Sequence, residues 1–518
     1  MNQRRLSVLP GLLILAVMII VGLCTYQDYG IAWDEPIQRE MGLVSGRYIF
    51  KGDKFLETYI ERDHGTGFEL PLVMLEKALR IKDSRDIYLM RHLVTHLFFL
   101  CSMFCGYLLL LRLTANQLLS CLGFLILLMH PRLYGHSFFN SKDVPFLCAL
   151  IIAFMFAESA LSTDRRRFFL MTGIALGYAT SIRILGILPL CVLSGLLLTR
   201  LLLKPSRSVN GLTNLAIRMF SLWTGFAAFT ILFWPTLWKN PVGAFLESYH
   251  SMSSFRWAGQ VKYKGVMVSG TDIPWDYLPT WFSITTPVVF LALGAFGLIS
   301  LIYWLLRRPL RFLKDPLFQT YLLYGCCTIL PVLMVIVLKS VVYDDWRHLY
   351  FIYPSFVLLG IGAVSRTKKD KRVAGAIAGA LIIQIGFTGV AMLKLHPFHQ
   401  VYFNRLVSHK PNHLLEQYDR EYWGTGVKQG MEYILEHDKR DEIRVTGIQL
   451  PIPQNRMILN ANDRQRINAF ESAENSDYGN ADYYITYFRE SSFPYHLKNV
   501  VYEESRQGSP VLRVYKLK

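Results

Sequence analysis

Long uninterrupted runs of hydrophobic residues dominate the first three quarters of the chain. Eleven of them approach the roughly 20 residues that a helix needs to cross a bilayer, at positions 6–24, 90–111, 115–130, 144–161, 168–182, 184–203, 213–233, 287–306, 317–338, 349–364 and 373–394. Only Arg183 separates the fifth run from the sixth, so a short connection or a re-entrant bend fits there equally well. The first run lacks a small-residue cleavage site and is interpreted as a retained span. The pattern predicts an α-helical membrane protein with about eleven spans.

The pattern changes after residue 394, where apolar runs become short and are separated by charges. Helical spacing covers about 425–437, and strand-like runs follow at 443–448, 482–488, 500–503 and 511–516. The last two strands should form a hairpin around Gln507-Gly508-Ser509-Pro510. We therefore expect a transmembrane domain over 1–394 and a small α/β domain outside the membrane over 395–518.

Composition supports the membrane assignment. Of the 518 residues, 52% are hydrophobic and only 18% are charged, too few charges to cover the surface of a soluble protein of this length. The net charge is +17, and its location explains it. If the N-terminus is cytoplasmic, the connections on that side hold eighteen Lys and Arg residues against three Asp residues. This is the positive-inside pattern, so the basic charge predicts topology and gives no support to nucleic-acid binding.

The opposite face then receives the segments 25–89, 131–143, 234–286 and 339–348 together with the tail. The first contains two amphipathic stretches, after Pro36 and over 68–79, which we expect on the membrane surface. The third is rich in tryptophan, which favours the headgroup level and predicts an interfacial loop: Trp234, Trp238, Trp257, Trp275 and Trp281.

Cysteine and histidine add little. All eight cysteines lie in or beside apolar runs and none follows Cys327, so the tail has no disulfide framework. Two spacings in the tail, His396 with His399 and His409 with His413, are compatible with zinc, but with no cysteine nearby we expect surface histidines.

Three acidic sites stand at the predicted outer membrane edges: Asp34-Glu35, Asp143 and Asp344-Asp345. Asp34 and Asp143 each precede a proline by two residues, which is also ordinary chemistry for a helix start, so capping is the competing interpretation. A carboxylate held near apolar surface instead has a raised pKa and can act as a general base.

Basic side chains share these edges: Lys142, Arg183, Arg347 and His348. Arginine is well suited to a phosphate group, and a nearby lysine adds a point charge. The competing interpretations are snorkelling at the membrane edge for Arg347 and an internal ion pair for Arg183.

At this point the sequence resembles a known family. Trp33-Asp34-Glu35 looks like the acidic pair in the first outer loop of GT-C glycosyltransferases, and the segment 130–146, ending in Asp143-Val144-Pro145-Phe146, looks like their second-loop signature. Trp346-Arg347-His348-Leu349-Tyr350 resembles their later arginine–aromatic motif, and Arg183 resembles a basic residue of the middle spans. His64 stands where relatives often have His-Pro-Pro, but here it is followed by Gly65-Thr66-Gly67. The resemblance is to the protein O-mannosyltransferases and the lipid A aminoarabinose transferase (glycosyltransferase family 39-like) and covers roughly residues 1–365.

The resemblance implies an enzyme of the bacterial inner membrane that moves a hexose or pentose, with inversion, from a polyprenyl-phosphate donor to a lipid, glycan or protein acceptor. It implies that Asp34 activates the acceptor with Glu35 beside it, that Asp143 positions acceptor or donor, and that Lys142 and Arg347 hold the lipid phosphate. Arg183, His348 and His64 are further candidate binding residues. No cofactor is certain; some relatives use a divalent metal, for which Asp34 and Asp143 would be the ligands here.

Two other functions compete with transfer. A transporter or flippase would place ionisable residues near the bilayer midplane, whereas the acidic residues of this chain lie in outer loops. A non-catalytic assembly protein with an external α/β domain is the third reading.

Overall fold

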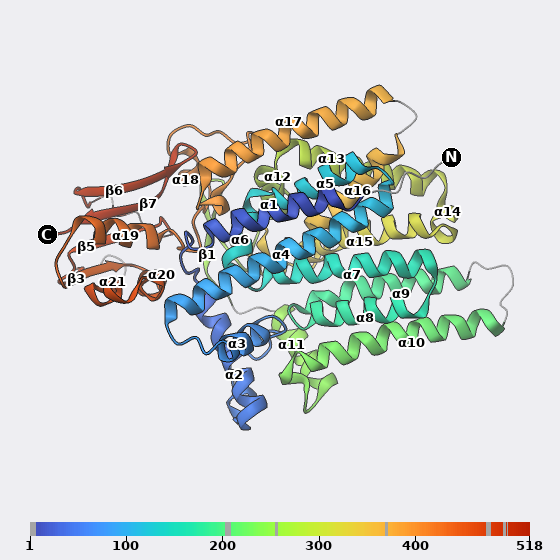
Figure 1. Ribbon diagram of the computed structural model, residues 1–518, viewed down its shortest axis with the longest axis horizontal. Coiled ribbons are helices and arrows are strands. Elements are labelled where there is room, and N and C mark those ends of the chain that lie inside the picture. Colours follow the sequence, from blue (N-terminus) through green and yellow to red (C-terminus); the bar gives the residue numbers. More distant parts are fainter. Residues whose placement is uncertain are drawn as a thin grey trace.

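The computed structural model describes residues 7–202, 209–253, 257–367, 371–472, 478–489, 494 and 496–518. Most helices run along the long axis as a bundle, and the α/β domain with the C-terminus caps one end of it (Figure 1). We call this the domain end and the opposite end, near the N-terminus, the basic end. The helical membrane architecture with a small C-terminal sheet domain is therefore as predicted.

The bundle contains the helices α1 (Leu9–Thr25), α4 (Ser84–Thr114), α5 (Gln117–Leu128), α6 (Pro131–Phe139), α7 (Asp143–Thr163), α8 (Arg166–Thr180), α9 (Ile187–Leu202), α10 (Val209–Leu232), α13 (Val288–Arg307), α14 (Pro309–Lys314), α15 (Pro316–Val337), α16 (Ile352–Arg366) and α17 (Lys371–Leu395). Every predicted span contains one of these helices. By length and composition, however, six of the described helices can cross a membrane: α4, α7, α10, α13, α15 and α17. A seventh span arises if α5 and α6, bent by 58° at their junction, count as one. The predicted number of eleven is thus not confirmed.

The described residues of the basic connections lie at the basic end. Asp164, in the turn after α7, pairs with Arg200 of α9 at 3.8 Å and with Arg218 of α10. The N-terminal end of the chain and α14 lie at the same end (Figure 1). The separation of basic connections from the α/β domain matches the charge pattern, while the assignment of the basic end to the cytoplasm stays a prediction.

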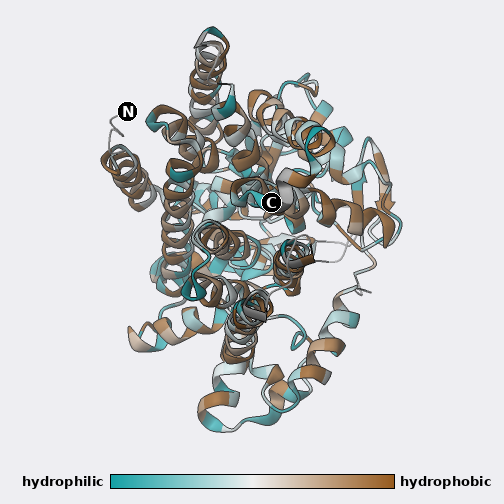
Figure 2. Ribbon diagram, turned by 90° about the vertical axis from the view of Figure 1, so that its right-hand side faces the viewer, coloured by the Kyte–Doolittle hydropathy of each residue, from teal (hydrophilic) through white to brown (hydrophobic). Residues whose placement is uncertain are grey.

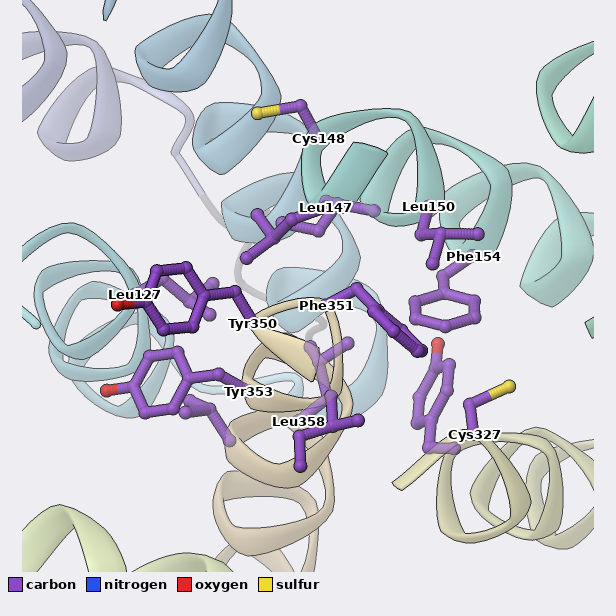
Figure 3. Close-up of a cluster of buried hydrophobic side chains, with 14 of the residues drawn as sticks. Leu127, Leu147, Cys148, Leu150, Phe154, Cys327, Tyr350, Phe351, Tyr353 and Leu358 are labelled. Atoms are coloured by element: carbon purple, nitrogen blue, oxygen red, sulfur yellow. The ribbon is translucent and has the colours of Figure 1, made fainter. Parts of the chain in front are cut away.

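The bundle core is densely apolar. Helix α16 is buried from Ile352 to Ser365, and its Leu358 lies in a cluster with Leu147 and Leu150 of α7 (Figure 3). Gly297 of α13 lets that helix pack closely against α16, since a Cβ at Gly297 would lie 2.5 Å from the backbone nitrogen of Gly360. Large apolar side chains also cover the outside of α1 and α17, and Figure 2 shows brown, hydrophobic residues on the helices around the bundle. An apolar outside over an apolar inside is what a lipid environment requires.

The connections at the domain end have structure of their own: α2 (Glu35–Lys51), η1 (Lys54–Glu57), α3 (Glu69–Ala78), η2 (Ile184–Gly186), η3 (Pro235–Leu237), α11 (Pro241–Ser253), β1 (Gln260–Tyr263), β2 (Val266–Ser269), α12 (Tyr277–Thr285) and η4 (Arg347–Leu349). The two amphipathic stretches of the first segment form α2 and α3, as predicted. The five tryptophans of the third segment differ in exposure, and the interfacial position of this segment stays a prediction. Trp234 and Trp281 are buried because they pack inside the protein, whereas Trp275 is 72% exposed.

The tail contains η5 (His399–Val401), α18 (His413–Gln417), α19 (Val427–His437), β3 (Ile443–Gly447), α20 (Pro451–Asn455), η6 (Arg456–Ile458), α21 (Ala461–Arg466), β4 (Ile467–Glu471), β5 (Tyr483–Thr486), β6 (Val500–Arg506) and β7 (Ser509–Lys516). The sheet order is β4-β3-β5-β7-β6, with β3 parallel to β4 and β5 and with β7 antiparallel to β5 and β6. The predicted hairpin is present, and its turn residues Gln507 and Gly508 both have positive φ. Strand β4 was not predicted.

Residues 395–426 contact both the bundle and the sheet, as Phe398 packs with Val511 of β7. The hydrophobic core of the α/β domain starts at Val427. Earlier tail residues such as Phe403 and Tyr418 pack into the core of the bundle instead. His399 is buried, and its Nδ1 is hydrogen-bonded to the Tyr29 hydroxyl at 2.9 Å. The prediction that His399 is a surface histidine was therefore wrong. Among the described residues, no group of three or more His, Cys, Asp or Glu side chains is placed to hold a metal ion.

Candidate functional site

A cavity of about 580 Å³ lies where the connections of the domain end meet. Six of the eight predicted site residues line it: Asp34, His64, Lys142, Arg183, Arg347 and His348. They come from five separate segments, which the fold brings together. We call this space the loop cavity.

Local sequence explains how two of these segments meet. The loop after His64 packs directly on the turn before Arg183, where the Gly67 backbone nitrogen donates to the Ser181 carbonyl at 2.9 Å. A Cβ on Gly65 would lie 2.0 Å from the same carbonyl oxygen. Glycine is therefore required at position 65, where the resembled family often has proline. His64 still lies in the cavity wall.

Arg347, at the start of η4, lies at the centre of the charged groups. Its Nη1 is 3.3 Å from Asp34 Oδ2 and 3.6 Å from Asp143 Oδ2, and its Nη2 is 3.3 Å from Asp344 Oδ2. The rings of Tyr343 and Trp423 lie 4.9 and 4.6 Å from its guanidinium carbon. All three ion contacts are longer than the 2.7–2.9 Å typical of a tight charge-assisted hydrogen bond. The arginine is thus held in place but is not closed off by any one partner.

Two of these carboxylates are bound more tightly by other arginines. Asp143 pairs with Arg183 and also accepts from Asn140 Nδ2 at 2.9 Å. Asp344 pairs with Arg489 of the tail at 2.5 Å. Arg347 therefore shares two acidic neighbours that already have a strong cationic partner.

Asp34 is different. Its side chain is 32% exposed, against 2% for Asp143, and within the described ranges its hydrogen-bond partner is Arg347. It makes no side-chain capping bond to α2. Desolvation in the cavity raises the pKa of its carboxyl, and Arg347 and Lys142 oppose that rise. Helix capping does not explain this aspartate, which faces the loop cavity with a carboxylate available for chemistry.

Asp143 does not cap α7 either: the residue at the N-cap is Lys142, and Asn140 Oδ1 accepts from the Asp143 backbone nitrogen at 2.8 Å. Its partners are Asn140, Arg183 and Arg347, so its role is to hold cations at the cavity wall. The alternative of an internal pair for Arg183 is what the geometry favours, although 17% of the Arg183 side chain stays exposed to the cavity.

Lys142 and His64 form a coupled pair. Lys142 Nζ donates to His64 Nδ1 at 2.8 Å, and His64 Nε2 faces Glu61 at 3.2 Å. Desolvation, helped by the positive charge of Lys142, lowers the pKa of His64 to about 4, so the imidazole is neutral at pH 7. Desolvation and Arg183 lower the pKa of Lys142 to about 8, which leaves it mostly protonated at neutral pH. His348 is also neutral, because burial and Arg347 hold its pKa well below the usual range.

Glu35 does not share the cavity with Asp34. Its Oε2 accepts from the backbone nitrogen of Ala32 at 2.8 Å, and its Oε1 lies 3.1 Å from His92 Nε2. Successive residues at a helix start point about 100° apart, which explains why neighbours in sequence face different surroundings.

A second arginine–carboxylate pair lies next to the cavity but outside its lining. Arg132 Nη1 and Asp345 Oδ2 are 2.5 Å apart and neither side chain is exposed. Tyr422 and Tyr350 donate to the same Asp345 oxygen at 2.7 and 3.2 Å. This pair ties the bundle, η4 and the tail together.

Several residues of the site were missed by sequence analysis. Glu61, Asp63, Trp257 and Tyr343 line the loop cavity, and the charged run Glu61-Arg62-Asp63 was a usable signal for the first two. Trp423 and Arg489 act from the tail, more than 70 residues from the nearest motif, and no local pattern marks them.

One side of the loop cavity is apolar. It is lined by Leu185 before α9 and by residues of α15 and the turn after it: Pro331, Met334, Val335 and Leu338. Leu338 is 58% exposed, so this side reaches the outer surface of a membrane-spanning helix. The cavity therefore combines a charged end with an apolar opening.

The donor set does not fit a divalent metal between Asp34 and Asp143. The space that both carboxylates face is taken by Nη1 of Arg347, and Asp143 is also held by Arg183. A cation placed there would meet two guanidinium groups at close range.

Comparison with known proteins gives weak likenesses. No protein-family model matches the sequence, and no curated protein matches it. The apo oligosaccharyltransferase of Archaeoglobus fulgidus is similar in structure with 9% identity and a TM-score of 0.49, over 90% of this chain and 64% of that one. ArnT from Cupriavidus metallidurans bound to undecaprenyl phosphate is similar with 13% identity and a TM-score of 0.48, over 97% of both chains.

A further structure of the archaeal enzyme, AglB in complex with an inhibitory peptide and a dolichol-phosphate, has 11% identity and a TM-score of 0.43. This chain spans about two thirds, 64%, of the length of the archaeal enzyme. With identities of 13% or less and TM-scores below 0.5, these likenesses assign neither a family nor an activity to the chain.

Proposed function

We propose that this protein is an integral-membrane glycosyltransferase that moves a sugar from a polyprenyl-phosphate-linked donor to an acceptor on the outer face of the membrane, with inversion. The observation that carries the proposal is the pairing pattern in the loop cavity. Arg347 has only long ion contacts, and Asp34 faces the cavity beside it. A loosely held arginine and an available carboxylate in one cavity suit an anionic leaving group and a hydroxyl nucleophile.

The donor phosphate is assigned to Arg347 and Lys142. The Nε atoms of Arg347 and Arg183 are buried and have no hydrogen-bond partner within the described part of the chain, so both arginines have donor capacity to spare. The polyprenyl chain is assigned to the apolar side of the cavity, along Leu185, Met334 and Leu338, where it leads out to the bilayer.

The transfer step follows from these positions. Asp34 takes the proton of an acceptor hydroxyl, and the oxygen attacks the anomeric carbon of the donor sugar. The bond between that carbon and the phosphate oxygen breaks, and the electron pair leaves with the polyprenyl phosphate, whose added negative charge Arg347 and Lys142 stabilise. A single displacement of this kind inverts the anomeric centre. Asp143 and Asp344 hold the cations, and no metal ion takes part in this scheme.

A transfer assay tests the proposal against the transporter alternative. Purified protein is reconstituted in vesicles with lipid-linked sugars and envelope acceptors extracted from the host. Release of polyprenyl phosphate and labelling of an acceptor are expected, and Asp34→Asn should lower the rate of both by about 10²–10⁴. Asp86→Asn is a matched control, since Asp86 is exposed in the same outer segment. Movement of intact lipid-linked sugar between leaflets, without cleavage, would refute the enzyme assignment.

The proposed location is the bacterial inner membrane, with the N-terminus in the cytoplasm and the α/β domain outside. The support is the concentration of basic connections at one end of the bundle. Reporter fusions after residue 112 should read cytoplasmic, and fusions to the C-terminus should read external. A cytoplasmic C-terminus would reverse the proposed active face.

A further inference from the structure

The tail supplies two side chains to the surroundings of Arg347: Trp423 from the segment before the α/β domain, and Arg489 from the α/β domain itself. The Trp423 indole packs over the guanidinium of Arg347 at 4.6 Å, and Arg489, just after β5, pairs with Asp344 at 2.5 Å. Neither residue lines the loop cavity. The tail therefore contacts Arg347 on the side away from the cavity. Trp423 touches it directly, and Arg489 acts through Asp344, the carboxylate that both arginines share.

Asp344 contacts two arginines, and its contact with Arg489 is shorter than its contact with Arg347. Its Oδ1 is 2.5 Å from Arg489 Nη1, whereas its Oδ2 is 3.3 Å from Arg347 Nη2. A charge-assisted contact at the shorter distance is much the stronger, because the longer one exceeds ordinary hydrogen-bond length. Asp344 is thus chiefly the partner of Arg489.

Arg489 changes the net charge that Asp344 presents to Arg347. With Arg489 in place, Asp344 is neutralised by a buried partner, and Arg347 keeps a guanidinium edge that an incoming anion can occupy. Without Arg489, the Asp344 carboxylate, whose side chain is 8% exposed, would keep its full charge and would face Arg347 at 3.3 Å. In a site this poorly solvated, the two would close into a tight pair. A phosphate would then have to break that pair in order to bind.

We propose that Arg489 of the α/β domain is a positioning residue for the donor site: by engaging Asp344, it keeps Arg347 available to the lipid phosphate. This inference rests on the proposed function, because it names what Arg347 binds. It also assigns the tail a part in donor binding, beyond shaping access for the acceptor.

The test measures binding of undecaprenyl phosphate and of undecaprenol, which has the same chain without the phosphate, to the full-length protein in detergent. Arg489→Ala should weaken undecaprenyl phosphate binding by about tenfold, roughly one charge-assisted contact, and leave undecaprenol binding unchanged. Adding Asp344→Asn to Arg489→Ala should restore binding to within about threefold, because the competing charge is gone. A merely structural role for Arg489 would not be rescued in this way.

Arg464→Ala is the matched control. Arg464 also joins the tail to the bundle, through Asp83 at 2.8 Å, but it lies outside the site. It should leave the binding of both lipids unchanged. If Arg489→Ala lowers the thermal stability of the protein, Asp344→Asn alone carries the test and should bind undecaprenyl phosphate at least as tightly as the parent.

Two results would overturn the inference while the proposed function stands: parental binding by a folded Arg489→Ala, or a tenfold loss in Asp344→Asn alone. A parent protein that binds undecaprenol and undecaprenyl phosphate equally would refute the proposed function, and this inference with it.

Discussion

Two arginine–aspartate clusters stand side by side in this protein and are built from the same kinds of residue. Asp344 and Asp345 are adjacent, both with positive φ, and they serve different arginines: Asp344 faces Arg347, and Asp345 faces Arg132. Both arginines have aromatic rings over their guanidinium groups, Arg347 under Trp423 and Arg132 near Trp281 at 5.2 Å.

The difference lies in pairing and access. The Arg132 pair is short, unexposed and bonded to two tyrosines, whereas the contacts of Arg347 are all long and open on the loop cavity. A short pair with no exposed side chain fixes the structure, while an arginine that has only long contacts and lies in the wall of a cavity can bind a ligand. Residue type alone thus does not distinguish a structural ion pair from a binding site, whereas the arginine–carboxylate distances do.

The largest expected effect separates Asp34 from both clusters. Asp34→Asn keeps the shape of the side chain and removes the proton acceptor, so transfer should fall by about 10²–10⁴. Binding of undecaprenyl phosphate should stay within about threefold of the parent, because Arg347 is retained. Turnover with a defined donor is the measurement, and near-normal turnover would contradict the assignment of Asp34 as base.

The closed cluster is tested by stability. Asp345→Asn leaves Arg132 as a buried charge without its counterion, a change that typically destabilises by about 3–5 kcal/mol. Its thermal unfolding in detergent should therefore shift strongly downward.

Asp344→Asn is the neighbouring control for this experiment. Asparagine tolerates the left-handed backbone that both positions require, so any difference between the two variants reports on the ion pairs. Asp344→Asn removes the counterion of Arg489, whose side chain is 16% exposed, so it should destabilise less than loss of the unexposed Arg132 pair. Unfolding of Asp345→Asn at the parental temperature would mean that the Arg132 pair does not stabilise the fold.

The open cluster is tested by ligand binding. Arg347→Ala removes a charge-assisted contact of roughly 1.5–3 kcal/mol, so binding of undecaprenyl phosphate should weaken by about tenfold or more. Arg347→Lys should recover only part of the loss, because lysine lacks the planar fork. Arg347 would be an anchor without a phosphate role if both variants bound the lipid like the parent.

The smallest effect concerns pH. The protonated form of Lys142 binds an anion, so its contribution is present below its pKa of about 8 and is lost as pH rises through that value. A bound phosphate stabilises the charged form and moves the decline upward. Transfer should also fall at low pH, as Asp34 becomes protonated at its raised pKa. The profile should therefore be bell-shaped, and Lys142→Arg should move its alkaline limb to higher pH.

Much of the fold follows from local pattern. The spans are set by runs of apolar residues, and the tail elements α19, β3, β5 and the β6–β7 hairpin by periodicity and turn residues. Strand β4 was not predicted because the segment from Ile467 to Glu471 contains Asn468 and Glu471 and does not alternate regularly between apolar and polar residues. The burial of Trp234 and Trp281 could not be predicted, because composition identifies an interfacial residue type but not which rings the protein itself covers.

The site was predictable where motif and geometry coincide. Six of eight candidates meet in one cavity because their segments all lie at the domain end of the bundle. Asp34, Lys142 and Arg183 directly precede helices, Arg347 and His348 lie in η4, and His64 lies in the loop before α3. Glu35 was grouped with Asp34 because the two are adjacent, and only the backbone direction shows that it faces His92. The contacts of Arg489 with Asp344 and of Arg132 with Asp345 join residues 145 and 213 positions apart, which no local rule can pair.

The shared cavity also has a consequence for kinetics. One space holds the proposed base and the proposed phosphate ligands, and the scheme assigns no side chain to carry the sugar between two half-reactions. Donor and acceptor must then be bound together before either product leaves. Double-reciprocal plots of initial rate against donor concentration, at several acceptor levels, should intersect to the left of the vertical axis, whereas parallel lines would indicate a glycosyl-enzyme intermediate.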